Sequence, residues 1–176
     1  RSAKYTKSSH YVTGFDYSIG NAAKVSIEGF VKRYANFPIS LIDGVSLANK
    51  GADFEVLGNE AVLTNGEGKT KGVEFLFQQK LTRNFYGIFS YTFFKSEFTD
   101  IHGYYRPSVW DIKHVSSFSG GYNLKRNWDI SSRWRFAGKT PYVPYDLEAS
   151  LNNYPNMVLD YSQLGNVKLG NFSQLD

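Results

Sequence analysis

The sequence predicts an all-β fold, an antiparallel up-and-down segment of a transmembrane β-barrel. Three observations predict it: long runs of alternating polar and apolar residues, connections that alternate between short and long, and an excess of aromatic residues. Of the 176 residues, 13 are Tyr, 14 are Phe and 3 are Trp. Because the hydrophobic content is 41%, below the usual globular share, this aromatic excess favours strands over helices.

The first two runs predict a hairpin. Residues 9–19 and 24–34 each alternate at period two, which indicates strands whose two faces meet different environments. In the second run, Glu28 and Lys32 fall on the face opposite Ile27. The apolar face of the pair carries Tyr11, Phe15, Tyr17, Val25, Ile27 and Val31.

A second hairpin is predicted from residues 70–81 and 85–98. Glu74 and Gln78 lie on the polar face of the first run, where Leu76 is an exception. The turn between the two runs spans three residues or so, as in tight hairpins. The apolar face carries Val73, Phe75, Phe77, Phe89, Tyr91 and Phe93.

A third hairpin is predicted from residues 113–123 and 128–138. Arg133 and Arg135 alternate with large apolar residues in its second run. Residues 172–176 read as the start of a seventh strand. The apolar face of this hairpin carries Phe118, Tyr122, Ile130, Trp134 and Phe136.

The lengths of the runs and of their connections favour a membrane barrel. The runs exceed the ~5 or 6 residues of a soluble strand and suit the ~9 to 11 of a tilted membrane-spanning strand. All 5 Pro fall outside the runs, as expected for paired strands. The connections resemble the tight turns and long external loops at the two rims of outer-membrane barrels. They are short at 20–23, 82–84 and 124–127 and long at 35–69 and 99–112.

The two faces predict opposite surroundings. In hydrocarbon a sheet must close to pair its backbone, its outer side chains must be apolar, and its inner ones can be wet. The predicted lumen-facing residues are Glu28, Lys32, Glu74, Gln78, Arg133 and Arg135. Two interfacial girdles are predicted from aromatic residues near the strand ends. They comprise Tyr17, Phe85, Tyr86, Tyr122 and Trp128 by the short turns, with Tyr34, Phe37, Phe98 and Trp110 by the long loops.

The sequence offers no catalytic, metal or cofactor residues, so we expect no enzyme. It has no cysteine, and its histidines lack a partner at metal-ligand spacing. Acidic residues of the long loop lack an EF-hand spacing, which favours a solvated role. The net charge of +4 is spread along the chain, so no nucleic-acid partner is expected. The residues considered are His10, His102, His114, Asp43, Asp53, Glu55, Glu60 and Glu67.

Several motifs together resemble the barrels of TonB-dependent outer-membrane receptors. A GVEF segment, a short turn and FYGIFSYT resemble a strand pair of that family, and WRFAGKTPY resembles a corner after a later strand. The segment FPISLIDG is similar to receptors typical of Bacteroidetes. The segments are 72–75, 85–92, 95–98, 110–114, 134–142 and 37–44.

The resemblance implies that residues 1–176 are the C-terminal part of a probable 22-stranded barrel, with about six strands and the start of a seventh. The family's N-terminal plug and closing strand are expected to lie outside this chain, as is any export signal. The implied function is import of an iron chelate, cobalamin, glycan or peptide across a Gram-negative outer membrane. The implied partners are that ligand, the TonB–ExbB–ExbD system acting through the absent N-terminal part, lipid or lipopolysaccharide, and a surface lipoprotein.

Two other functions fit the same residues. A passive porin or adhesin-like barrel has the same strands without energy coupling. A soluble β-rich glycan-binding domain would use Trp110, Trp128 and Trp134 as stacking platforms for sugars. Strand length and loop asymmetry favour the membrane barrel over the soluble domain.

Overall fold

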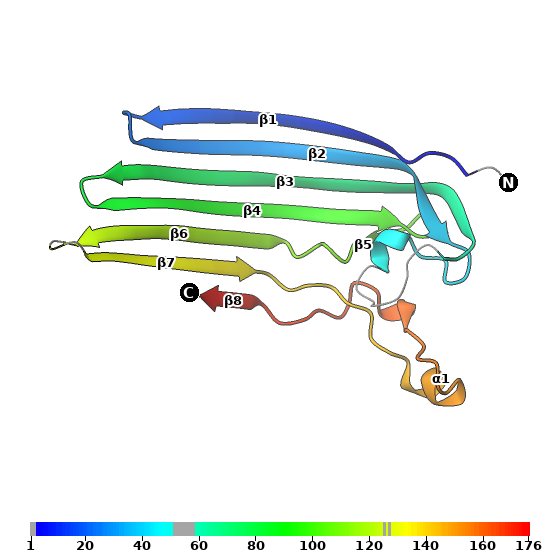
Figure 1. Cartoon of the computed structure of the whole chain (residues 1–176). Helices are drawn as coiled ribbons and strands as arrows, with labels where there is room; N and C mark the ends of the chain where they lie inside the picture. The colour runs from blue at the N-terminus through cyan, green and yellow to red at the C-terminus, as the bar shows by residue number, and fades with distance from the viewer. Residues whose placement is uncertain (1–2, 51–58, 125, 127) are drawn as a thin grey trace.

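The computed structural model describes residues 3–50, 59–124, 126 and 128–176, which form one antiparallel sheet with loops at one end (Figure 1). The strand order is β1-β2-β3-β4-β6-β7-β8, and the short β5 pairs with β4. Strands adjacent in the sheet are therefore consecutive in the chain apart from β5, which is an up-and-down arrangement. The strands are β1 (Lys7–Ile19), β2 (Ala23–Ser40), β3 (Val62–Thr82), β4 (Phe85–Thr99), β5 (Tyr105–Pro107), β6 (His114–Leu124), β7 (Trp128–Ala137) and β8 (Phe172–Leu175).

The all-β prediction is confirmed, and each of the six runs corresponds to one long strand. The expected start of a seventh strand is β8. Every strand pairs antiparallel with its neighbours, so the three predicted hairpins are present as β1–β2, β3–β4 and β6–β7.

β2 and β3 are longer than predicted, and the long connection is correspondingly shorter. Residues expected in a loop over 35–69 belong instead to β2 as far as Ser40 and to β3 from Val62 onward. The pairing of the two strands shifts register around Phe37, next to Asn36 at φ 58°. Such bulges break the two-residue alternation by which a strand is recognised, which explains the missed extension.

The expectation that all prolines lie outside strands is wrong for Pro38, in β2, and for Pro107, in β5. A proline cannot donate a ladder hydrogen bond, so it suits a strand edge or a bulge. The pairing of β1 with β2 ends where Lys7 meets Ala35. Beyond that point β3 is the one described strand that pairs with β2, and Ile39 forms an isolated bridge with Ser46. Pro38 therefore lies beside the bulge, between the end of the β1 pairing and this bridge.

Short and long connections lie at opposite ends of the sheet, as predicted (Figure 1). We call these ends the short-turn rim and the loop rim. Gly20 and Arg83, at φ 58° and 57°, provide the left-handed backbone of two tight turns at the short-turn rim. The loop rim holds the helices α1 (Leu147–Asn152), η1 (Leu47–Asn49) and η2 (Tyr161–Gln163). No helix among the described residues has the length and apolar character needed to cross a bilayer.

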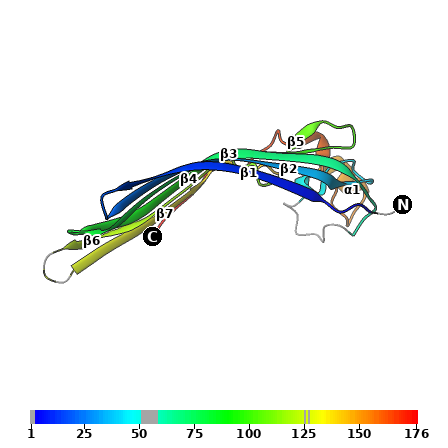
Figure 2. The same cartoon turned by 90° about the horizontal axis from the view of Figure 1, so that it is seen from above.

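The buried apolar side chains gather at the loop rim rather than under the middle of the sheet. Val45, Val143 and Leu164 form one cluster that joins three segments distant in sequence. Figure 2 shows the same division, with a curved sheet one layer thick and the loops packed at one end. The buried hydrophobic residues are Ile39, Val45, Ala48, Phe98, Val109, Val143 and Leu164.

The sheet is open in the described residues. β1 and β8 are its two outer strands, and each has a partner on one side alone. Open edges expose backbone donors and acceptors that favour pairing with another strand.

Candidate functional site

The strand register shows that the sheet has one apolar and one polar face. Paired residues in neighbouring strands point to the same face, so the pairing defines rows across the sheet. One row, from β1 to β8, consists of Tyr17, Val25, Phe77, Phe89, Phe118, Trp134 and Leu175. The next row, on the opposite face, consists of Asp16, Ser26, Leu76, Ser90, Ser117, Arg135 and Gln174.

The apolar face is exposed, although its side chains are large. Phe15 is 64% exposed and Ile130 is 60% exposed. Monomeric soluble proteins rarely leave an apolar patch of this extent uncovered, so such a face marks contact with lipid or with a partner.

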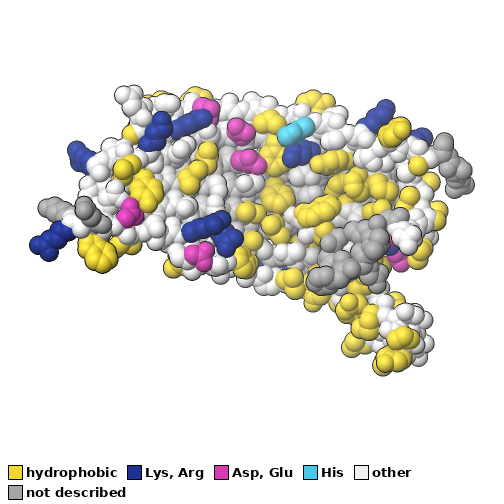
Figure 3. All heavy atoms as spheres, viewed as in Figure 1, with side chains coloured by type: hydrophobic (Ala, Val, Ile, Leu, Met, Phe, Trp, Pro, Cys, Tyr) yellow, Lys and Arg dark blue, Asp and Glu magenta, His cyan; other side chains and the backbone are white. Residues whose placement is uncertain are grey.

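All six predicted lumen-facing residues lie on the polar face. Glu28 pairs directly with Glu74 across β2 and β3. Gln78 belongs to the same row as Arg133, linked by Ile88 and Ser119. Acidic and basic side chains are visible on this face of the sheet in Figure 3. The other members of the set are Lys32, which pairs with Thr70, and Arg135, which pairs with Ser117.

Glu28 and Glu74 border a polar hollow of about 310 Å³. On its β1 side, Asp16 accepts a hydrogen bond from Ser26 and lies 3.0 Å from the Lys24 ammonium. Two directly opposed carboxylates repel each other unless water or a cation screens them. The hollow is therefore better suited to contact with water than to contact with lipid. Alternation along each strand predicts that Asp16 and Ser26 lie on the polar face. Their position beside Glu28 follows from the pairing between strands, which alternation alone does not predict.

The two arginines form a separate group. β7 is three strand steps from β3, about 14 Å at the usual strand spacing, so Arg133 and Arg135 do not join the carboxylates of Glu28 and Glu74. Arg135 donates a hydrogen bond from Nη2 to Gln174 Oε1 at 2.9 Å. The arrangement separates acidic and basic areas along one face.

Four of the five aromatic residues predicted near the short turns lie on the apolar face, and the fifth does not. Tyr17, Phe85, Tyr122 and Trp128 lie exposed on the apolar face. Tyr86 lies on the polar face instead, because it pairs with Gly121 and its hydroxyl donates to Asp129 at 3.3 Å. Alternation along β4 already separates Tyr86 from Phe85.

The predicted girdle at the loop rim is wrong for Tyr34, Phe37 and Phe98. These rings pack against one another, with centroids 5.4 Å apart for Tyr34 and Phe98 and 4.5 Å for Phe37 and Phe98. Phe98 is 3% exposed, so it stabilises the end of the sheet and cannot reach a lipid interface. Trp110, at 56% exposure, is the exposed member of the predicted set.

A buried ion-pair network joins the two ends of the β2–β3 connection. Lys50 donates to Glu60 Oε1 at 2.8 Å and also pairs with Asp43, while Ser40 donates to Glu60. Burial alone would lower the pKa of Lys50, but the hydrogen bonds to Asp43 and Glu60 outweigh it and raise that pKa. Burial opposes ionisation of Glu60, yet Lys50 and Ser40 lower its pKa. The prediction of a solvated role is therefore wrong for Glu60, because no local pattern in the sequence indicates that Lys50 and Ser40 lie beside it.

The remaining candidates have structural surroundings. Of the residues the structure describes, no three His, Cys, Asp or Glu side chains are grouped to hold a metal ion. His114 Nδ1 lies 2.8 Å from the hydroxyl of Tyr91, and His10 packs edge-on against Phe30. Asp53 and Glu55 lie outside the described residues.

The fold is similar to that of an outer-membrane receptor. No protein-family model and no curated protein matches the sequence. Among solved structures, the chain is similar to the ferripyoverdine receptor of the outer membrane of Pseudomonas aeruginosa bound to ferripyoverdine. The match has a TM-score of 0.64 and 16% identity and covers 97% of this chain. Because it covers 20% of that receptor chain, this chain spans a fifth of the receptor's length. The likeness shows a shared fold.

Proposed function

We propose that residues 1–176 are a section of the β-barrel of a TonB-dependent outer-membrane receptor that imports a nutrient. The observation that carries this is the pair of adjacent rows, one wholly apolar and one almost wholly polar, each crossing seven strands. Hydrocarbon tolerates a sheet of this kind on its apolar side, and a water-filled barrel interior accepts its polar side.

The fold likeness and the receptor-like motifs support the same assignment. The apolar face would meet lipid, and the polar face with Glu28, Glu74 and Arg133 would line the lumen. The loop rim would face outward and contribute to ligand capture, together with any surface lipoprotein. Energy would come from the TonB–ExbB–ExbD system through a part of the receptor outside these residues. We assign no catalysis to this chain.

The transported ligand belongs to the small molecules or oligomers that such receptors import. The similar receptor was solved with ferripyoverdine, which makes an iron chelate one candidate for this chain. A cobalamin, a glycan and a peptide are the alternative ligands. The separate acidic and basic areas on that face favour a ligand with both donors and acceptors.

Spin labels test which face meets lipid. In the full-length protein reconstituted in vesicles, nitroxides at Phe75, Phe89 and Trp134 should be relaxed by oxygen dissolved in acyl chains. Labels at Ser90 and Ser117 on the polar row are the matched controls and should respond to a water-soluble nickel chelate. Labels on the apolar face that are shielded from both reagents would show a dry protein interior and contradict the proposal.

Energy coupling needs a separate measurement. The full-length protein should bind purified TonB, and ligand uptake by cells should stop when TonB is deleted. Uptake that continues without TonB would assign the barrel to passive porins instead.

A further inference from the structure

The polar face carries acidic, aromatic and basic side chains in order along β2. Glu28, Phe30 and Lys32 alternate with residues of the apolar face, so all three lie on the polar face. Across the pairing with β3, Glu28 lies opposite Glu74 and Lys32 lies opposite Thr70. A carboxylate pair, an aromatic ring and an ammonium group therefore follow one another toward the loop rim. We call this series the bipolar strip, and Figure 3 shows acidic and hydrophobic side chains side by side on this face.

The acidic end of the bipolar strip has unpaired charge. Glu28 and Glu74 are both exposed and oppose each other directly. Within residues 3–50, 59–124 and 128–176, neither carboxylate has an ion pair or a hydrogen bond. Asp16, which also borders the hollow of about 310 Å³, is already paired with Lys24 at 3.0 Å. Because like charges at opposed positions destabilise a sheet, Glu28 and Glu74 favour a cationic group in that hollow.

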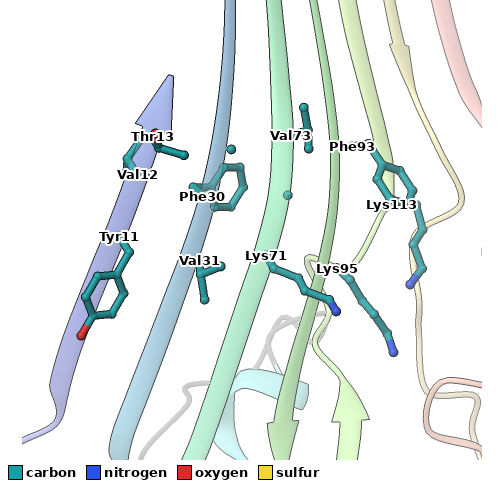
Figure 4. A pocket seen from close by; sticks show the side chains of 12 residues that line it. Tyr11, Val12, Thr13, Phe30, Val31, Lys71, Val73, Phe93, Lys95 and Lys113 are labelled. Carbon is teal, nitrogen blue, oxygen red and sulfur yellow. The ribbon is translucent and has the colours of Figure 1, made fainter. Parts of the chain in front are cut away.

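The middle of the bipolar strip is apolar. The ring of Phe30 reaches from β2 across Gly72 of β3, where a Cβ atom would lie 2.7 Å from the ring. Figure 4 shows this ring directed toward β3. The same Cβ atom would lie 2.7 Å from Phe94 of β4, so the missing side chain lets the two aromatic residues approach each other. Val12, which is 52% exposed, extends the apolar surface onto β1.

The basic end of the bipolar strip has a free ammonium group. The Lys32 ammonium lies 5.3 Å from the centroid of the Phe30 ring, and His10 contacts the same ring edge-on. Because Phe30 lies between Glu28 and Lys32 along β2, this contact directs the ammonium toward the acidic end. In the described part of the chain Lys32 has no acidic partner, so its charge is available to an anionic group.

We propose that the bipolar strip binds a short peptide with free ends, its ammonium at the carboxylate pair, its carboxylate at Lys32 and an apolar side chain on Phe30. The inference rests on the proposed function and selects one class among its ligands. Glu28 and Lys32 are separated by about 13 Å between Cα atoms. Three extended peptide residues span about 11 Å at most, and the two side chains cover the remainder. A neutral glycan would leave both charged ends unpaired, whereas a zwitterion complements both.

Blocked peptides test the two charged ends separately. The full-length protein in detergent is titrated by calorimetry with alanyl-phenylalanyl-alanine, with its N-acetylated form and with its C-terminal amide. Each blocking group removes one charge, so each should weaken binding roughly tenfold, the loss expected for one charged hydrogen bond. Replacement of the central phenylalanine by serine should also weaken binding, because the contact with the Phe30 ring is lost.

Substitutions assign each end of the peptide to its residues. Glu28→Gln/Glu74→Gln should bind the free and N-acetylated peptides equally and still prefer the free carboxylate to the amide. Lys32→Gln should show the opposite pattern. The preference that remains in each variant shows that the variant is folded. Asp129→Asn and Lys80→Gln remove the same charges near the short-turn rim, so these matched controls should keep both preferences.

Two results would overturn the peptide site. One is equal binding of the free and both blocked peptides by the wild type. The other is a variant that keeps the preference at the end its substitution should abolish.

These results are separable from failure of the proposed function. Spin labels at Phe75 and Phe89 report whether the apolar face meets acyl chains, independently of any peptide. If these labels meet lipid while blocking either end changes nothing, the peptide site fails and the barrel assignment stands. If the labels are shielded from lipid, the barrel assignment fails, and with it a site that depends on a lumen.

Discussion

Lys50 illustrates what single residues contribute at the loop rim. Its side chain is 8% exposed and has two acidic partners, Asp43 and Glu60, and it also lies 5.6 Å from the ring centroid of Tyr161. A buried ammonium is costly unless its charge and hydrogen bonds are satisfied. Both acidic partners belong to the β2–β3 connection, so the network joins Asp43 and Lys50 at one described end of that connection to Glu60 at the other.

Replacing Lys50 should loosen the β2–β3 connection. Lys50→Met leaves Asp43 and Glu60 without their cation and should weaken local protection by roughly 1–3 kcal/mol. Hydrogen exchange of the Ser40 and Leu41 amides, which donate to Val45 and Ala61, measures this opening. Lys4→Met, which alters an exposed lysine, is the control and should leave both amides protected.

The same network predicts a pH window. The raised pKa of Lys50 gives a stabilisation that is present below its ordinary value of 10.5 and is lost as the pH rises through the folded value. The lowered pKa of Glu60 gives a stabilisation that is present above 4.5 and is lost as the pH falls through the folded value. Protection factors of the two amides should therefore be highest between these limits. Glu60→Gln should remove the acid limb, and an acid limb that survives this change would assign it to another group.

At the scale of elements, the sequence predicted each long strand and its faces but not the strand ends. Alternation is reliable where one side of a strand is apolar, as in β4 and β7, because the surroundings impose it. At the bulge around Phe37 the alternation fails, so the end of β2 could not be recognised. β5 has three residues, too few to show any period. The polar face was predictable for the same reason as the strands, since the six candidates are defined by the same alternation.

The two rims should differ in access from outside the cell. An epitope inserted after Gly103 extends a loop-rim connection at a point where the glycine Cβ position has no neighbour within 4 Å. Antibody should therefore label intact cells. The same epitope inserted after Arg83, at the opposite rim, should be labelled in permeabilised cells alone. The reverse pattern would invert the proposed orientation of the barrel.

At the scale of the whole molecule, the described residues form an open sheet whose outer strands, β1 and β8, each pair on one side. The sequence predicted the sheet but not what stabilises its loop end, because contacts such as Val45 with Val143 and Leu164 join distant segments whose proximity no local pattern encodes. The adjacency of Lys71 and Lys95 on the apolar face likewise follows from strand pairing and not from a local pattern. Local patterns in the sequence thus predict the strands but not which residues of neighbouring strands lie opposite one another.

The open edges predict self-association of the isolated chain. In the part of the chain that the structure describes, β1 pairs with β2 alone, whereas β4 lies between β3 and β6. In detergent, oxidation of a Val12→Cys chain should give covalent dimers through edge pairing, and Thr92→Cys on β4 should remain monomeric. The native sequence has no cysteine, so each variant carries a single thiol. Equal dimer yields from both variants would show contact through the faces rather than the edges.

The concentration of buried apolar residues at the loop rim has a consequence for sequence change. Side chains such as Ile39 and Phe98 sit among fixed neighbours, and their replacement must respect volume and shape. Side chains such as Phe15 and Ile130 on the apolar face would meet fluid acyl chains, which reshape around whatever they contact. Along most of the sheet, selection would then act on hydrophobicity alone. At the loop rim it would also act on the volume and shape of each buried side chain. The sequence of the loop rim would therefore change more slowly during evolution than the sequence of the apolar face.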